Sequence, residues 1–215
     1  MLEPERITER IYKKYKYTHY EKDWIYGVWY CGTSFQKAEY YGQFPPTFID
    51  RVLAGFPIDD LKVLHLCCGK CNIEDAVNVD IMFLPEADVC ADGERLPFAD
   101  SVFDMCLLDP PYSEEDSTRY GVKRLIRPKK TMEEIYRCLV PGGWLLWLDE
   151  KYPSYFRKNW KLHGLIAIVT GFERRTRILS MFRKHGKHEF IHIPRSKQLR
   201  LMEDGNVYAT TGKDN

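Results

Sequence analysis

Short apolar runs alternate with polar or helix-like segments from residue 62 onward. Apolar runs of about four to eight residues that lack a period of two are typical of parallel strands buried on both faces. Five segments fit this description: KVLHLC (62–67), VNVD (77–80), DVCAD (88–92), FDMCLLD (103–109) and GWLLWLD (143–149).

Two further apolar runs, GLIAIVT (164–170) and RILSMF (177–182), are separated by GFERRT. This arrangement favours an antiparallel hairpin at a sheet edge. The alternation of strands and helices predicts an α/β fold, with a doubly wound, mostly parallel sheet, an antiparallel edge strand and helices on both faces. Sheets of this kind bind their ligands at the carboxyl ends of the strands.

Two helices are predicted between or before these strands. The first follows Pro45 and Pro46 and ends near Gly55, and the second is predicted to start with a capping box formed by Thr131 and Glu134. Pro141-Gly142-Gly143 is predicted to turn the chain into the next strand. The apolar faces are Phe48, Ile49, Val52, Leu53 and Phe56 in the first helix, and Met132, Ile135, Tyr136 and Leu139 in the second.

The first 44 residues have a different pattern. Residues 3–17 place Ile7, Ile11, Tyr12 and Tyr15 at helical spacing, while residues 18–44 are rich in aromatic side chains and lack a clear period. We interpret residues 1–44 as an N-terminal helical and aromatic extension or lid. Residues 45–215 are then one domain with a short C-terminal tail.

Composition limits the classes of protein that fit. The 215 residues, 44% of them hydrophobic, are enough for one domain with a substantial core. No apolar run reaches the roughly eighteen residues of a membrane span, and the N-terminus lacks the apolar segment of a secretory signal. We therefore expect a cytoplasmic protein without a membrane partner. The oligomeric state stays open.

The stretch HLCCGKC (65–71) holds three of the seven cysteines. Cys68 and Cys71 form a C-x-x-C and Cys67 adds a third thiol, which is compatible with a metal or redox site. No second C-x-x-C completes a ligand set. We therefore favour a ligand-binding loop in which small residues replace glycines, with no metal and with reduced thiols.

Four landmarks follow one another: VLHLCCGKC (63–71), NVD (78–80), ADGERLPFADSVFD (91–104) and DPPY (109–112), before LVPGGWLLWLDE. Together they resemble the class I S-adenosylmethionine-dependent methyltransferases over roughly residues 40–185. DPPY resembles the signature of the amino-methylating branch, best known from adenine-specific DNA methyltransferases. The resemblance implies a Rossmann-like sheet and S-adenosylmethionine as the cofactor.

The resemblance also implies which residues bind the cofactor. In the family, the loop after the first strand reads hydrophobic, acid, hydrophobic, G-x-G-x-G. Here His65 stands at the acid, cysteines stand at the first and third glycines, and only Gly69 is retained. By the same resemblance Asp80 accepts hydrogen bonds from both ribose hydroxyls, and Asp92 receives the adenine amino group. The implied cofactor residues are His65, Cys67, Cys68, Gly69, Asp80, Ile81, Asp92, Gly93 and Leu96.

DPPY fits the chemistry of amine methylation. An exocyclic amine on adenine or cytosine is a poor nucleophile because its lone pair is delocalised into the ring. Asp109 supplies a carboxylate and Pro110 a carbonyl whose direction is held by two fixed φ angles. Tyr112 offers a face on which an extruded base can stack. We predict Asp109, Pro110, Pro111 and Tyr112 as catalytic residues, with a tight turn after a strand as the other interpretation.

YYGQFPP (40–46) resembles the segment that helps close over the methionine end of the cofactor in DNA-amino methyltransferases. Tyr40, Tyr41 and Phe44 fit a hydrophobic core equally well. Both interpretations stay open from the sequence.

Positive charge is concentrated in the second half, where residues 120–200 hold 19 Lys and Arg against 6 Asp and Glu, although the net charge is +1. With interleaved aromatics such as Tyr155 and Trp160, this pattern predicts nucleic acid as the partner, DNA rather than RNA. A solvated basic face is the alternative. The cluster comprises Lys123, Arg124, Arg127, Lys129, Lys130, Arg157, Lys158, Lys161, Arg174, Arg175 and Arg177.

The leading hypothesis is therefore a methyltransferase that uses S-adenosylmethionine to methylate an exocyclic amino nitrogen of a nucleic-acid base, with adenine N6 in DNA as the first candidate. A target base in duplex DNA would have to be flipped out of the stack. The alternatives are the same chemistry on a small molecule or a protein amide, and a non-catalytic binding protein that kept the fold. A cysteine–metal module is the third alternative.

Overall fold

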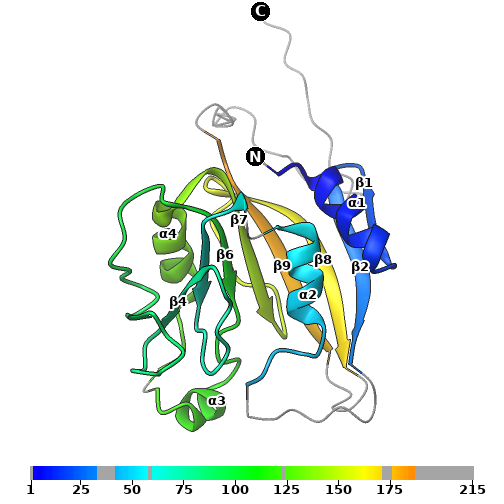
Figure 1. The fold of residues 1–215 in the computed structure, drawn as a ribbon. Coiled ribbons are helices and arrows are strands. Elements are labelled where there is room, and N and C mark those ends of the chain that lie inside the picture. Colours follow the sequence, from blue (N-terminus) through cyan, green and yellow to red (C-terminus); the bar gives the residue numbers. More distant parts are fainter. Residues whose placement is uncertain (1, 33–41, 58–59, 123, 171–175, 187–215) are drawn as a thin grey trace, which may run out of the picture.

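The computed structural model describes residues 2–32, 42–57, 60–122, 124–170 and 176–186 (Figure 1). These residues form a nine-stranded sheet in the order β1-β2-β8-β9-β7-β6-β3-β4-β5. The strands are β1 Thr18–Glu21, β2 Trp24–Cys31, β3 Val63–Leu66, β4 Ala76–Asp80, β5 Val89–Cys90, β6 Phe103–Leu108, β7 Leu139–Asp149, β8 Trp160–Thr170 and β9 Thr176–Lys184. The helices are α1 Pro4–Lys14, α2 Phe48–Gly55, α3 Glu114–Arg119 and α4 Pro128–Cys138.

The seven apolar runs are all strands, as predicted, and the sheet is mostly parallel. Strands β3 to β7 pair in parallel, and so do β2 and β8, whereas β1 is an antiparallel edge strand. The runs at 164–170 and 177–182 form the predicted antiparallel pair, β8 and β9. That pair is not at the edge, because β9 lies between β7 and β8 and the sheet continues through β2 to β1.

Helices cover both faces of this sheet (Figure 1). On one face Ile7 and Ile11 of α1 and Phe48 of α2 pack in a core with Met181 of β9. On the other face α4 packs in a second core. The α/β architecture with helices on both faces is therefore confirmed. No helix in the described part of the chain is both long and apolar enough to cross a membrane.

Helix α4 begins earlier than the capping box predicts. It starts at Pro128, and Thr131 lies inside it with its hydroxyl buried and without a hydrogen-bond partner. The capping-box interpretation is therefore wrong. Proline is well suited to the first helical position because its missing N–H has no partner there anyway. Glu134 instead accepts a hydrogen bond from the backbone N–H of Leu96, 2.8 Å away.

The N-terminal residues are part of the same sheet. Helix α1 was predicted, but β1 and β2 were not, because their aromatic residues show no regular alternation. Strand β2 pairs with β8 from Ile25 to Cys31. The indole N–H of Trp144 in the central strand β7 also donates to the carbonyl of Leu2 at 3.0 Å. The division of the chain near residue 44 stays a prediction.

Candidate functional site

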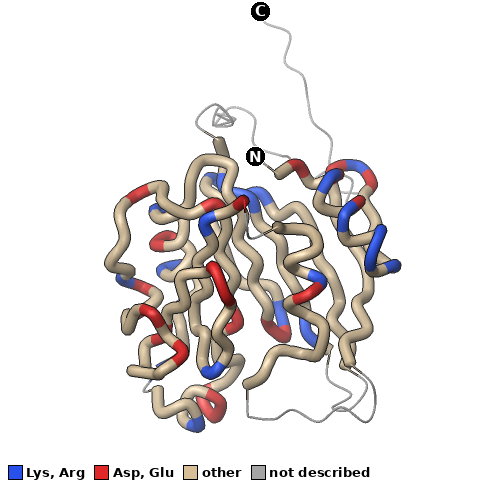
Figure 2. The backbone as a smooth tube through the Cα atoms, in the orientation of Figure 1, with Lys and Arg blue, Asp and Glu red and all other residues tan. Residues whose placement is uncertain are grey.

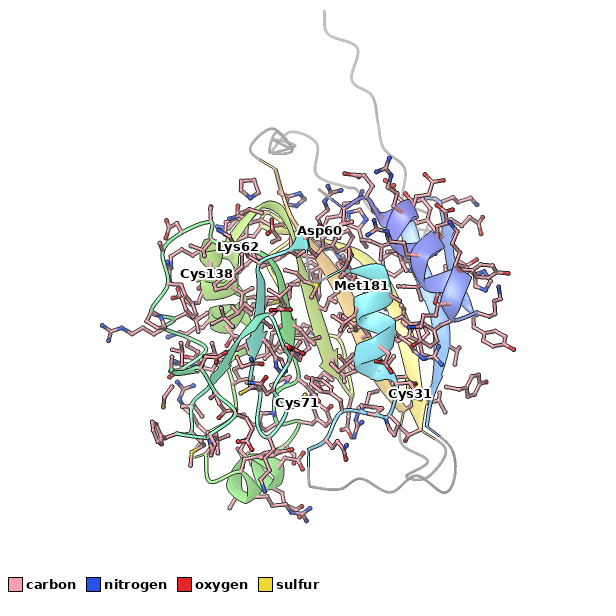
Figure 3. The ribbon with its side chains drawn as sticks, in the orientation of Figure 1. Cys31, Asp60, Lys62, Cys71, Cys138 and Met181 are labelled. Atoms are coloured by element: carbon pink, nitrogen blue, oxygen red, sulfur yellow. The ribbon has the colours of Figure 1, made fainter. Side chains whose placement is uncertain are left out.

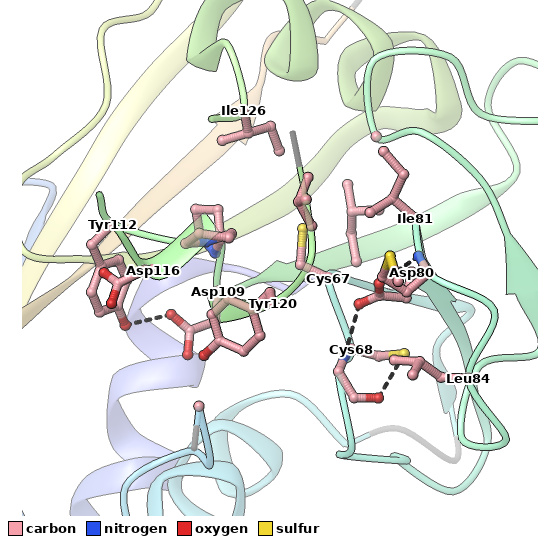
Figure 4. Close-up of a pocket in the computed structure, with 18 of the residues that line it drawn as sticks. Cys67, Cys68, Asp80, Ile81, Leu84, Asp109, Tyr112, Asp116, Tyr120 and Ile126 are labelled. Atoms are coloured by element: carbon pink, nitrogen blue, oxygen red, sulfur yellow. Dashed lines mark hydrogen bonds between the residues drawn. The ribbon is translucent and has the colours of Figure 1, made fainter. Parts of the chain in front are cut away.

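A cavity of about 680 Å³ lies at the carboxyl ends of β3, β4 and β6 (Figure 4). This edge of the sheet carries Cys71 and Cys31 in Figure 3, opposite the edge with Asp60 and Lys62. The position is the one expected for a doubly wound sheet. Of the predicted site residues the cavity wall includes Cys67, Cys68, Gly69, Asp80, Ile81, Asp92, Gly93, Asp109, Pro110, Pro111 and Tyr112.

Asp80 organises the floor of this cavity from the last position of β4. Its carboxylate accepts hydrogen bonds from the backbone N–H groups of Gly69 and Met82, each at 2.9 Å. Asp80 therefore ties the loop after β3 to the loop after β4. A carboxylate oxygen accepts two hydrogen bonds, so each oxygen keeps the capacity to meet a ribose hydroxyl.

The cysteine-substituted loop keeps the backbone conformation of a glycine loop. Cys67, at the first glycine position, has a φ of 59°, and Gly69 has a φ of 53°. A Cβ on Gly69 would meet no atom within 4 Å. The space above Gly69 is therefore open to a ligand, as the resemblance implies, while Cys67 adopts a left-handed conformation that is uncommon for residues other than glycine.

His65 and Leu96 do not line the cavity. His65 is fully buried and its Nδ1 lies 2.9 Å from the side-chain oxygen of Asn78. Burial lowers the pKa of His65 to about 4, so the imidazole is neutral at pH 7. Leu96 is buried in the core beside α4. These two residues depart from the expectation because both side chains point into packed cores.

Asp92, Glu94 and Arg124 form the wall on the β5 side, and Arg127 supports it from behind Glu94 through an ion pair. Arg124 contacts Asp92 at 3.1 Å and Glu94 at 2.6 Å, and Arg127 forms an ion pair with Glu94. The side chain of Glu94 is only 6% exposed. Hydrogen bonds from Arg127, ahead of those from Arg124, lower the pKa of Glu94 to about 2. The network fastens residues 124–127 to the loop after β5.

Glu94→Gln should make the unfolding free energy of the protein less dependent on pH. Because the pKa of Glu94 in the folded state lies below its ordinary value of 4.5, its stabilisation is complete above that value and is lost as pH falls towards about 2. We expect the variant to lose about 1–2 kcal/mol of unfolding free energy at pH 7 and almost none at pH 2.

Urea unfolding at a series of pH values measures this difference. Glu115→Gln is the matched control, because it removes an exposed helical ion pair with Arg119 and should cost well under about 1 kcal/mol. A loss in Glu94→Gln that is the same at every pH would contradict the assignment.

Asp109 and Tyr112 form the wall at the end of β6. The phenol hydroxyl of Tyr112 donates a hydrogen bond to Oδ1 of Asp109 at 2.5 Å (Figure 4). Burial, and after it the neighbouring Asp109 carboxylate, raise the pKa of Tyr112 well above its usual range. Tyr112 is therefore a neutral donor that holds the Asp109 carboxylate in place. Pro110 is buried and lines the cavity.

The cysteines near the cavity do not form a metal site among the described residues. No group of three His, Cys, Asp or Glu side chains there could hold a metal ion. All seven cysteines are free thiols. Burial raises the pKa of Cys67, Cys68 and Cys71, so these thiols are protonated and poor nucleophiles at pH 7.

Two segments distant in sequence meet over the cavity. Gly42, Gln43 and Phe44 line it from the N-terminal side, and Tyr120, just after α3, lines it from the other. Gly42 has a φ of 83°, and a Cβ at this position would lie 2.0 Å from the hydroxyl oxygen of Tyr120. Phe44 also stacks on Phe48 of the core, so it serves both interpretations of YYGQFPP. Tyr40 and Tyr41 are outside the described residues.

Gly42→Ala should displace Tyr120 and weaken binding in the cavity. Gly121→Ala is a matched control, because Gly121 also has a positive φ of 73° but its Cβ would meet only Met82, at an ordinary 3.6 Å. Each variant should lose about 1–2 kcal/mol of unfolding free energy from the left-handed backbone. Only Gly42→Ala should also reduce the affinity for S-adenosylhomocysteine in a calorimetric titration, and equal affinities would contradict the contact.

Several cavity residues were not predicted. Tyr120 and Ile126 follow α3, and Lys70, Met82 and Leu84 follow predicted strands. The positions of Lys70, Met82 and Leu84 after predicted strands were a usable signal for these three residues. Arg177 gave no such signal, because it lies near the start of the antiparallel strand β9. It reaches the cavity only because of the order of strands in the sheet.

Several residues of the predicted basic cluster contact acidic or aromatic side chains. Figure 2 shows basic and acidic residues interspersed over the molecule. Arg124 and Arg127 pair with Glu94, and Lys161 lies 3.0 Å from Asp23. Lys129 and Lys158 lie near the ring of Phe156. Lys123, Arg174 and Arg175 lie outside the described residues.

Part of this site lies in a segment that matches a known family model. Residues 72–147 match the family model described as "Methyltransferase domain", and this range includes Asp80, Asp92 and DPPY. This segment resembles a methyltransferase domain. The match and the doubly wound sheet support a class I methyltransferase with S-adenosylmethionine as its cofactor. The cavity fits that cofactor, because Asp80 and the open space above Gly69 lie in it together.

Two solved structures have weak similarity to the chain. An N-methyltransferase, NodS from Bradyrhizobium japonicum WM9 in complex with S-adenosyl-L-homocysteine, has a TM-score of 0.39 and 11% identity, over 58% of this chain and 78% of its own. The [4+2]-cyclase SpnF has a TM-score of 0.43 and 11% identity, over 73% of this chain and 87% of its own. The search of curated proteins gave no match.

Proposed function

We propose that the protein is an S-adenosylmethionine-dependent N-methyltransferase that methylates an exocyclic amino nitrogen of a nucleic-acid base, with adenine N6 in DNA as the first candidate. The observation that carries the proposal is the pairing of Asp109 with Tyr112 in the same cavity as Asp80. Asp80, which would bind the cofactor, ends β4, and Asp109, which would bind the amine, follows β6. These two strands lie on either side of β3.

The chain's own residues would activate and position the amine. Asp109 accepts a hydrogen bond from one amine N–H, and the Pro110 carbonyl, held by two consecutive prolines, accepts the other. These two acceptors favour the geometry in which the nitrogen lone pair is directed out of the ring system. The ring of Tyr112 gives the base a stacking surface worth about 1–3 kcal/mol.

When bound, S-adenosylmethionine supplies an electrophilic methyl group. Asp80 and the loop at Gly69 would hold the cofactor at one end of the cavity, and Asp109 would hold the amine at the other. The protein therefore contributes mainly by positioning the two reactants. The methylated nitrogen is acidic enough to lose its proton to Asp109 or to water. The Tyr112 hydroxyl keeps the Asp109 carboxylate oriented before the acceptor arrives.

Transfer of a radiolabelled methyl group tests this proposal. Labelled cofactor is incubated with duplex DNA, single-stranded DNA, RNA, nucleosides and a set of small amines and peptides, and the product is separated by size and digested. Label in N6-methyladenine supports the proposal. The proposal would be refuted if S-adenosylhomocysteine binds but no label enters the nucleic acids or the nucleosides.

A small-molecule acceptor is the second candidate, and the charge of α3 favours it. This helix follows DPPY directly and begins with Glu114, Glu115 and Asp116, of which Asp116 lines the cavity. Carboxylates at the mouth of a cavity repel a phosphate backbone. Label that passes a size filter and is absent from the nucleic-acid fraction would favour this acceptor class.

A further inference from the structure

Arg177 is a charged residue at the acceptor end of the cavity, not part of an exposed basic face. It is the second residue of β9 and is only 8% exposed, yet it lines the cavity. Leu179 and Met181, on the same face of β9, are fully buried in the core. Strand β9 runs antiparallel to β7, so its first residues lie at the edge where the parallel strands end. The face of β9 therefore changes from core to cavity at Arg177.

Tyr112 lies close to both Asp109 and Arg177. Its hydroxyl is 2.5 Å from the Asp109 carboxylate, and the centre of its ring is 5.8 Å from the guanidinium carbon of Arg177. An acceptor base lying against this ring would therefore have both a carboxylate and a guanidinium nearby. The amine and the phosphate lie at opposite ends of a nucleotide. The amine can therefore meet the carboxylate while the phosphate meets the guanidinium.

The cavity is lined by the carboxylates of Asp80, Asp92, Asp109 and Asp116, and Arg177 brings a permanent positive charge beside Tyr112. The planar set of N–H donors of the guanidinium fits a phosphate through two parallel hydrogen bonds.

We propose that Arg177 binds a phosphate of the acceptor whose base lies against Tyr112. This inference rests on the proposed function and deepens it, because it assigns the acceptor to the phosphorylated nucleosides. The phosphate comes from a free nucleotide or from a nucleic-acid strand, and both sources present the same group to Arg177. Arg177 is then a residue for acceptor specificity.

Binding to the full-length protein saturated with S-adenosylhomocysteine tests this proposal. The probes are deoxyadenosine, deoxyadenosine 5′-monophosphate and a short single-stranded oligodeoxynucleotide with one adenine. We expect the wild-type protein to bind the monophosphate about 10–100-fold more tightly than deoxyadenosine. In Arg177→Gln this ratio should fall close to one, while the affinity for S-adenosylhomocysteine stays the same.

Arg157→Gln is the matched control, because it removes the same charge from an exposed side chain of the predicted basic cluster. Its monophosphate-to-nucleoside ratio should equal that of the wild type. If Arg177→Gln does not fold, Arg177→Lys keeps the charge but loses the paired donors, and it should give an intermediate ratio. Equal binding of monophosphate and nucleoside by the wild type, or an unchanged ratio in the Arg177 variants, would overturn the proposal.

The oligonucleotide separates the two sources of phosphate. If its affinity depends on Arg177 as strongly as that of the monophosphate, the phosphate belongs to a strand; dependence of the monophosphate alone indicates a free nucleotide. If no nucleobase compound binds, the proposed function fails, and inorganic phosphate becomes the probe. If the wild type binds phosphate and Arg177→Gln does not, Arg177 is still part of an anion-binding site. If the wild type binds no phosphate, the anion site is overturned together with the proposed function.

Discussion

Replacing Asp109 with asparagine should reduce methyl transfer about 10²–10⁴-fold, which is the usual size of a lost general base or amine-positioning carboxylate. The amide keeps the shape of the side chain and one acceptor oxygen, so Tyr112 can still donate to it. It loses the negative charge that strengthens the hydrogen bond to the amine and accepts the proton. Binding of S-adenosylhomocysteine should be unchanged.

Single-turnover transfer and calorimetric titration together measure these two quantities. Asp104→Asn is the matched control on the same strand: Asp104 lies near the opposite end of β6 and accepts a hydrogen bond from the backbone N–H of Lys62 at 2.9 Å. It should leave transfer unaffected. Full activity in Asp109→Asn would mean that DPPY acts only as a turn after β6.

Replacing Asp80 with alanine should have the largest effect on cofactor affinity. The variant loses the carboxylate that would meet the ribose, and it also releases Gly69 and Met82 from their hydrogen bonds. Hydrogen bonds to a charged group are worth about 1.5–3 kcal/mol each, so we expect S-adenosylhomocysteine to bind at least about 100-fold more weakly.

A melting curve with added S-adenosylhomocysteine gives a second measure of the same effect. Ligand at a hundredfold over its dissociation constant adds about 2.7 kcal/mol, or roughly 5–10 °C for a chain of this length. Asp60→Ala, on the exposed opposite edge of the sheet, should keep the full shift, and Asp80→Ala should lose it. A full shift in Asp80→Ala would place the ribose elsewhere.

The sequence determined the strands and most of the site because both depend on local patterns. Buried parallel strands need continuous apolar runs, so the runs ending at Asp80 and Asp109 indicated both the strands and the positions of these carboxylates at their ends. The same logic placed Gly69 and the two cysteines before it in one loop. The seven strands from β3 to β9 and helix α2 followed from spacing alone.

Only the tertiary structure decided the features that depend on strand order and burial. Strand β9 inserts between β7 and β8, which brings Arg177 to the cavity from a segment that the charge pattern assigned to the surface. His65 stands at the family's acidic position, yet its side chain is buried against Asn78. Strands β1 and β2 form because β8 offers a free edge, a partner that no local pattern reveals. Charge and spacing are properties of short segments, whereas pairing, ion pairs such as Glu94 with Arg127, and desolvation depend on which segments meet in space.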